Sequence, residues 1–253
     1  MRFGCCAGLE QIETVRDAGY DYVELAVGAV KPEQPDSEFE AIREALEESG
    51  ICPEAWNCLL PGKMKVVGPE VDSYRIERYQ RTAFARIEEL RGEVVVFGSG
   101  AARMVPDGFP MDEANDQLIE FLTLAGQVGG AHGITIAVEP LNHRETNVLN
   151  SVRAGAEIVR AVSHPFVKLL VDLYHVQCQD EPLTDIAVGQ GEFVHAHTAD
   201  TDRFYPGSGS YPNREFIKAL RAAGYDDRLS VECVWRDFDS ECAKALDYLR
   251  GLI

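Results

Sequence analysis

The sequence predicts one (β/α)₈ barrel, a ring of eight parallel strands that are each followed by a helix. Two observations lead to this fold class. Eight short apolar runs recur through the 253 residues, and segments with the apolar spacing of helices lie between them. The runs are apolar at nearly every position, which is typical of a parallel sheet whose outer face is covered by helices. A repeat of about 32 residues matches one strand, one helix and their two loops.

The predicted strands are the short runs in which apolar residues predominate. They cover residues 2–6, 22–27, 52–59, 94–98, 134–139, 167–172, 193–197 and 229–233.

The predicted helices combine helical apolar spacing with good helix formers, and the clearest cover residues 38–50, 75–92, 114–133, 151–163 and 241–251. Four of them end in glycine, at Gly50, Gly92, Gly133 and Gly251. A glycine at this position predicts a left-handed C-terminal cap.

A doubly wound sheet is the alternative α/β arrangement, but the first turn, "GCCAGLEQ", lacks the GxGxxG pattern that usually opens it. No linker, low-complexity tract or shift in composition divides the chain. We therefore expect a single domain over residues 1–253, with residues 60–72 as a long loop at the rim.

Composition limits the partners and the compartment. Lys and Arg number 24 against 42 Asp and Glu, a net charge of −18, and no basic run offsets it locally. We therefore expect neither nucleic acid nor an anionic membrane as a partner. The seven cysteines are odd in number and form no CxxC pair, which favours reduced thiols in a cytoplasmic protein. No signal sequence or membrane span is evident.

Four consecutive predicted strands end on, or next to, a side chain that can bind a metal. These are Glu139, Asp172, His197 and Glu232. Side chains alternate between the faces of a strand, so each shares a face with the residue two positions before it. If that face is the barrel interior, all four converge at the C-terminal end of the strands, where such barrels carry their chemistry.

Three carboxylates and one imidazole buried together would be costly without a cation. An oxygen-rich set with one imidazole suits Mn²⁺ first, with Mg²⁺ or Co²⁺ as alternatives, better than structural zinc. Taken singly, each acid also fits a helix cap or a loop ion pair, and His195 alone fits a hydrogen-bonded core histidine. Four such residues at consecutive strand ends favour the metal site.

The segments that carry these residues resemble the D-tagatose/D-psicose 3-epimerases, within the sugar phosphate isomerase/epimerase group that has a xylose-isomerase-like barrel. The most specific segments are "VEPLNHRETNVLN" (138–150), "VDLYH" (171–175), "HAHTADTDRFYPGSG" (195–209) and "VEC" (231–233). After His197 the chain departs from the family, which commonly has a Gly-Glu pair there. This departure leaves the contacts to the far end of the substrate open.

The resemblance implies that Glu139, Asp172, His197 and Glu232 hold one divalent ion, and that Glu139 and Glu232 are the acid/base pair. It also implies that Glu145, His175 and Arg203 bind the sugar. Glu24, in "YVEL", stands where the family has an acid near the barrel mouth, although a structural ion pair fits equally well. A homodimer or homotetramer is expected from the resemblance alone.

We therefore predict a metal-dependent sugar isomerase or epimerase. Such an enzyme removes a proton next to a carbonyl, stabilises the enediolate and returns the proton, with the two glutamates as acid and base. A lyase on the same barrel is the main alternative, either a keto-inositol dehydratase or an enzyme that cleaves C-glycosides. An apurinic endonuclease is disfavoured by Asn57 and Ser99 at the third and fourth strand ends, where extra histidines would be needed. A sugar-binding protein without catalysis is the last alternative.

Overall fold

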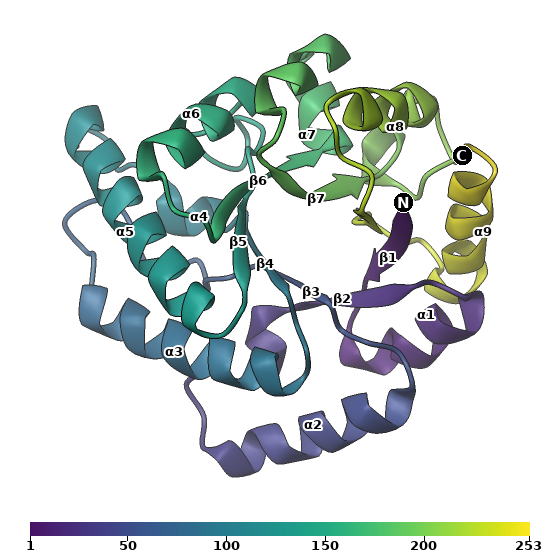
Figure 1. Ribbon diagram of the computed structural model, residues 1–253, viewed down its shortest axis with the longest axis horizontal. Coiled ribbons are helices and arrows are strands. Elements are labelled where there is room, and N and C mark those ends of the chain that lie inside the picture. The colour runs from purple at the N-terminus through teal and green to yellow at the C-terminus, as the bar shows by residue number, and fades with distance from the viewer.

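The computed structural model describes residues 1–253. Eight parallel strands form a closed barrel in which each strand pairs with the next in chain order and β8 pairs with β1 (Figure 1). The strands are β1 Arg2–Cys6, β2 Tyr22–Ala26, β3 Ala55–Asn57, β4 Val94–Phe97, β5 Thr135–Val138, β6 Val167–Asp172, β7 Phe193–Thr198 and β8 Arg228–Val231. The predicted fold class is confirmed.

Helices surround the strands as an outer ring (Figure 1). The α-helices are α1 Ile12–Ala18, α2 Asp36–Ser49, α3 Ser73–Glu89, α4 Gly100–Arg103, α5 Met111–Ala131, α6 Val152–Val162, α7 Leu173–Cys178, α8 Asn213–Ala222 and α9 Phe238–Arg250. Four 3₁₀ helices add η1 Leu9–Gln11, η2 Val27–Val30, η3 Leu183–Gly189 and η4 Thr201–Arg203. The short helices α4, α7 and η4 follow β4, β6 and β7, so they lie at the C-terminal end of the barrel. None of the helices has the length and apolar character needed to cross a membrane.

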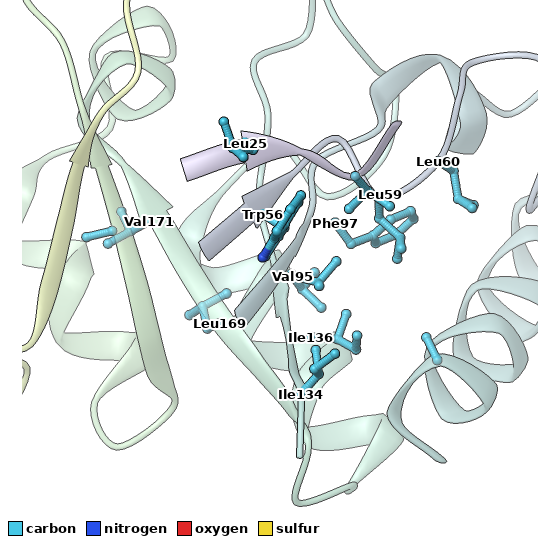
Figure 2. Packing of buried hydrophobic residues seen from close by; sticks show 14 of the residues in the cluster. Leu25, Trp56, Leu59, Leu60, Val95, Phe97, Ile134, Ile136, Leu169 and Val171 are labelled. Carbon is cyan, nitrogen blue, oxygen red and sulfur yellow. The ribbon is translucent and has the colours of Figure 1, made fainter. Parts of the chain in front are cut away.

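Alternating strand residues divide into two apolar layers. The larger cluster, of 61 residues, fills the space between strands and helices, and Figure 2 shows Leu25, Trp56, Val95 and Leu169 within it. The smaller cluster lies inside the barrel and consists of Tyr22, Ala55, Val94, Val96, Ala137 and Leu170. Since Ala137 and Leu170 face the interior, Glu139 and Asp172, two residues further on, project into the same space.

Strands β5 and β8 end one residue earlier than the predicted metal ligands. Glu139 and Glu232 therefore follow their strands directly. Both remain in register, because the Glu139 N–H donates to the Phe97 carbonyl at 3.2 Å and the Glu232 N–H donates to the Thr198 carbonyl at 3.0 Å. The neighbouring strand thus fixes the backbone of each glutamate at the barrel mouth.

Two of the four predicted glycine caps are present. Gly50 and Gly133 have φ of 77° and 69°, the left-handed conformation expected after a helix. The predictions for Gly92 and Gly251 are wrong. After α3 the left-handed residue is Arg91, and Gly92 is needed for packing, because a Cβ there would lie 2.4 Å from the indole nitrogen of Trp56. Gly251 has a right-handed φ of −72°.

Ion pairs close the N-terminal end of the barrel. Arg228 donates from Nε to Glu54 Oε2 at 3.0 Å and also bonds Glu93. Arg2 donates to the same Glu54 oxygen at 2.6 Å and to Asp227 at 3.1 Å. Each acid of this cluster therefore contacts a guanidinium.

Candidate metal centre and substrate site

The four predicted metal ligands meet at the C-terminal end of the barrel. Glu139, Asp172, His197 and Glu232 each offer one ligand atom, and these atoms all lie within 4.8 Å of one another. The first three are buried, whereas the Glu232 side chain is 21% exposed and so borders the open mouth. Two of them end or lie within strands and two follow strands directly, which confirms the convergence predicted from the strand ends.

The carboxylates of this cluster are not balanced by the protein alone. Burial, followed by the charge of Glu232, raises the pKa of Asp172 to about 8. Burial also raises the pKa of Glu139. Asp172 Oδ2 is buried and has no hydrogen-bond partner. A divalent cation among these oxygens would offset the burial cost of all three acids, so the donor set fits such an ion.

Glu232 is held ionised. Burial alone would raise its pKa, but the charge and hydrogen bond of His197 and the charge of Arg203 outweigh that effect and hold the pKa at about 2. Glu139 and Glu232 therefore contact the same nitrogen of His197, and in the metal-free protein their pKa values are shifted in opposite directions. Their distances to His197 Nδ1 are 3.1 Å from Glu139 Oε1 and 3.4 Å from Glu232 Oε2.

The other ring nitrogen of His197 contacts Glu24. His197 Nε2 lies 2.9 Å from Glu24 Oε1, and the second Glu24 oxygen lies 2.8 Å from His195 Nε2. All three side chains are fully buried. Glu24 thus forms structural ion pairs, one of the two roles that its sequence position allowed. One of these pairs joins it directly to His197, a predicted metal ligand.

Cys6, Glu24 and His197 form a second group whose possible ligand atoms approach within 4.8 Å. Both Glu24 oxygens already accept imidazole hydrogen bonds, and burial raises the pKa of the Cys6 thiol well above its usual value. The first group is therefore the better cation site.

His175 presents one defined N–H to the site. Its Nδ1 accepts hydrogen bonds from the backbone N–H of Asn142 at 3.2 Å and from the Asn142 side-chain amide at 2.9 Å. A nitrogen that accepts two hydrogen bonds carries no proton, so the proton is on Nε2. Nε2 is buried without a partner, 3.6 Å from Asp172 Oδ2, and burial lowers the pKa of His175 to about 3. His175 is therefore a neutral donor.

Arg203 connects two of the predicted site residues. Its guanidinium donates to Glu232 Oε2 at 2.7 Å, lies 3.4 Å from Glu145 Oε1, and is 4.6 Å from the centre of the Tyr174 ring. From the sequence alone, Arg203 could also have formed a loop ion pair with Asp200 or Asp202, but the structure contains no such pair. Asp200 instead accepts backbone N–H bonds from Thr201, Gly207 and Tyr211, which folds the 200–211 loop.

The Arg203 backbone is strained. Asp202 and Arg203 have φ of 61° and 62°, in the left-handed region that few side chains adopt. The Arg203 carbonyl accepts the Val234 N–H at 2.6 Å, which ties this segment to the chain after β8. Strain of this kind persists only where surrounding contacts hold it, and it gathers at functional sites.

The segment after β4 supports Glu139 and was not singled out by the sequence. A Cβ on Gly98 would lie 2.3 Å from Glu139 Oε2, and a Cβ on Gly100 would lie 2.6 Å from the Glu145 carbonyl oxygen. Arg103, fully buried, donates to the Glu139 carbonyl at 2.6 Å and to the Phe97 carbonyl at 3.2 Å. The only signal in the sequence is "GSGAAR", two glycines and an arginine directly after a strand.

Comparison with known proteins identifies the family and the fold of this chain. The family model described as the xylose isomerase-like TIM barrel matches residues 12–252. D-psicose 3-epimerase from Agrobacterium fabrum is 27% identical over 229 residues, which cover 87% of this chain and 77% of that protein. 3-Dehydro-D-guloside 4-epimerase from Escherichia coli is 22% identical over 88% of this chain and 86% of its own.

Two solved structures share the fold. D-psicose 3-epimerase from Clostridium cellulolyticum H10, described with D-tagatose, superposes with a TM-score of 0.87 at 21% identity, covering 100% of this chain and 99% of that one. The IolI protein, described with a binding zinc atom, has a TM-score of 0.78 at 19% identity, covering 100% and 96%. The chain therefore belongs to the xylose isomerase-like TIM barrel family, as its motif segments predicted.

Proposed function

We propose that this protein is a metal-dependent epimerase of ketose sugars that acts at the carbon next to the carbonyl. One observation carries the proposal: the carboxylates of Glu139 and Glu232 both lie close to His197 Nδ1, at 3.1 and 3.4 Å, at the mouth of a barrel. The two epimerases matched above support the reaction class, since each inverts a carbon beside a carbonyl in the sugar that its name describes.

Glu139, Asp172, His197 and Glu232 would hold the divalent ion, with Mn²⁺ as the first candidate and Mg²⁺ or Co²⁺ as alternatives. When bound, the ion would polarise the substrate carbonyl and so make the neighbouring C–H more acidic.

Two carboxylates beside one cation site suit an acid/base pair. Glu232, ionised beside the Arg203 guanidinium at 2.7 Å, accepts the proton from one face of the carbon. Glu139, the more buried of the two, donates a proton to the other face. For the opposite epimer the two glutamates exchange roles, because the reaction runs in both directions.

Three further side chains would orient the sugar. The unpartnered Nε2–H of His175, 3.6 Å from Asp172 Oδ2, would donate to a sugar oxygen. Glu145 would accept a hydroxyl hydrogen bond. Arg203 keeps both Glu145 and Glu232 in place and adds a fixed positive charge near the developing oxyanion.

Hydrogen exchange tests this proposal. The protein is loaded with Mn²⁺ and incubated with a panel of free ketoses and keto-inositols in D₂O, and proton NMR spectra are recorded after the protein is removed. We expect deuterium at the carbon beside the carbonyl, together with the epimeric sugar. A product lacking a β-substituent would instead establish a lyase, and no exchange with any member of the panel would overturn the proposal.

A further inference from the structure

Glu24 is a carboxylate in the barrel interior whose partners are two histidines, with no lysine or arginine paired to it. It lies on β2 and is fully buried. Its two oxygens contact His197 Nε2 at 2.9 Å and His195 Nε2 at 2.8 Å, and no lysine or arginine forms an ion pair with it. A buried carboxylate placed between two imidazoles costs free energy unless both nitrogens donate to it.

The contact with His197 determines which of its nitrogens can bind a cation. Nδ1 faces Glu139 and Glu232, so it is the nitrogen directed at the candidate metal centre. A neutral histidine has one protonated nitrogen, and a nitrogen that binds a metal must be the other one. The proton must therefore be on Nε2, where Glu24 accepts it.

The opposite tautomer would be favoured without Glu24. A proton on Nδ1 could bond to Glu139 or Glu232, but it would stand where the ion belongs. An ionised Glu24 opposes this arrangement because a carboxylate can only accept a hydrogen bond.

A second chain of contacts holds Glu24 in this orientation. His195 Nε2 donates to the other Glu24 oxygen, Ser230 Oγ lies 3.4 Å from the same nitrogen, and Tyr22 OH lies 2.9 Å from Ser230 Oγ. The rings of His195 and His197 are nearly perpendicular, at 84° with centres 5.0 Å apart. With one imidazole on each oxygen, the carboxylate cannot rotate without losing a hydrogen bond.

We infer that Glu24 is a positioning residue that fixes the metal-binding tautomer of His197, and that His195 keeps Glu24 in place. This inference rests on the proposed metal site, but not on the identity of the sugar. Carboxylates that orient metal-bound histidines in this way typically change metal affinity by about 10- to 100-fold when they are removed.

Glu24→Gln is the test variant because it preserves the size of the side chain. Its amide group can donate to His197 Nε2 and so favour the wrong tautomer. We expect the dissociation constant for Mn²⁺, measured by isothermal titration calorimetry, to rise about 10- to 100-fold. Glu24→Asp restores the charge and should recover part of the loss. Tyr22→Phe removes only the far hydroxyl and should change the constant less than about threefold.

Nitrogen NMR of the histidine rings in the Zn²⁺-loaded protein reports the tautomer directly, since Zn²⁺ is diamagnetic. In the wild type we expect His197 to carry its proton on Nε2, in a strong hydrogen bond, and in Glu24→Gln that signal should be lost or weakened. A Glu24→Gln variant that binds Mn²⁺ within threefold of wild type would overturn the inference. So would a wild-type His197 protonated on Nδ1, a result that holds even if the variant fails to fold.

These measurements separate the inference from the proposed function. A wild-type protein that binds Mn²⁺ and has the expected tautomer, yet exchanges no ketose proton, would refute the epimerase and leave the role of Glu24 supported. A wild-type protein that binds neither Mn²⁺ nor Zn²⁺ would refute the inference together with the metal site.

Discussion

The two ends of the barrel both gather acidic side chains, but they balance them differently. At the N-terminal end Glu54, Glu93 and Asp227 each contact Arg2 or Arg228. At the C-terminal end the three acids Glu139, Asp172 and Glu232 converge, and only Glu232 among them forms an ion pair with an arginine, Arg203. Asp172 has only neutral His175 near its free oxygen, at 3.6 Å.

This difference distinguishes acids that are paired within the protein and stabilise the fold from acids whose charge would be balanced by a bound cation. In the N-terminal cluster Glu93 and Asp227 are 60% and 50% exposed, so water as well as arginine balances their charge. Asp172 is buried and pairs with no arginine, and such an acid shifts its pKa or binds a cation. The shift of the Asp172 pKa to about 8 is the mark of the second kind. We therefore expect the acids at the N-terminal end to contribute to stability and those at the C-terminal end to contribute to metal binding and catalysis.

The largest effect is expected at the two glutamates of the mouth. Glu139→Gln and Glu232→Gln keep the side-chain size but remove the groups that exchange the proton, so kcat should fall about 100- to 10,000-fold in each. Turnover is measured on the sugar found by hydrogen exchange, and circular dichroism checks that the fold survives. Near wild-type turnover in either variant would rule out the two-glutamate mechanism.

Metal affinity should depend steeply on pH. Asp172 must lose its proton to bind an ion, and its pKa of about 8 means that the metal-free protein holds that proton at neutral pH. Between pH 6 and 8 the dissociation constant for Mn²⁺ should fall about tenfold per pH unit from this group alone. Titration calorimetry in buffers of different ionisation enthalpy measures both the constant and the proton released.

The same shift predicts how stability changes with pH. The folded pKa of Asp172 lies above its unfolded value, so the metal-free protein loses this part of its stability as pH rises from about 4 to 8. The metal-loaded protein should not lose this stability. The difference between the melting temperatures of the metal-loaded and metal-free proteins should therefore widen between about pH 4 and 8. A constant gap would show that Asp172 is not a ligand.

Gly98→Ala tests whether the residue after β4 holds the Glu139 carboxylate in position. The added Cβ would lie 2.3 Å from Glu139 Oε2, so the carboxylate must move. We expect kcat to fall about 10- to 100-fold, because small misplacements of reacting groups are costly. Gly28→Ala is the matched control, since a Cβ there meets nothing within 4 Å. Equal rates in the two variants would mean that the position of Glu139 is not critical.

The sequence predicted the barrel and the converging ligands because both depend on local patterns. Alternation along a strand is enough to place Glu139 on the inner face with Ala137, and the order of strands then brings it near His197. Strand boundaries differ from the predicted ones by up to three residues, as in β3, but this did not affect the predicted ligands because each stays on the same face of its strand.

The supporting residues could not be predicted, because their roles depend on contacts across space. Glu24 is 173 residues from His197, and nothing local distinguishes it from a salt-bridging acid. Arg103 lies on the four-residue helix α4, which follows Ser99 in a left-handed conformation that no residue type there indicates. The need for glycine at position 98 arises only once the Glu139 side chain is in place.

The smallest effect on catalysis is expected at the N-terminal end. Glu54→Gln removes the acid shared by Arg2 and Arg228 and leaves the nearly buried Arg228 with fewer partners, which should lower the free energy of unfolding by about 1–3 kcal/mol. Denaturant titration measures that loss. Because this cluster lies at the opposite end of the strands, kcat and Mn²⁺ affinity should stay within about twofold of wild type. If either fell as far as in the Gly98→Ala variant, the two ends would be coupled through the strands, and the division between structural and catalytic charge would not hold.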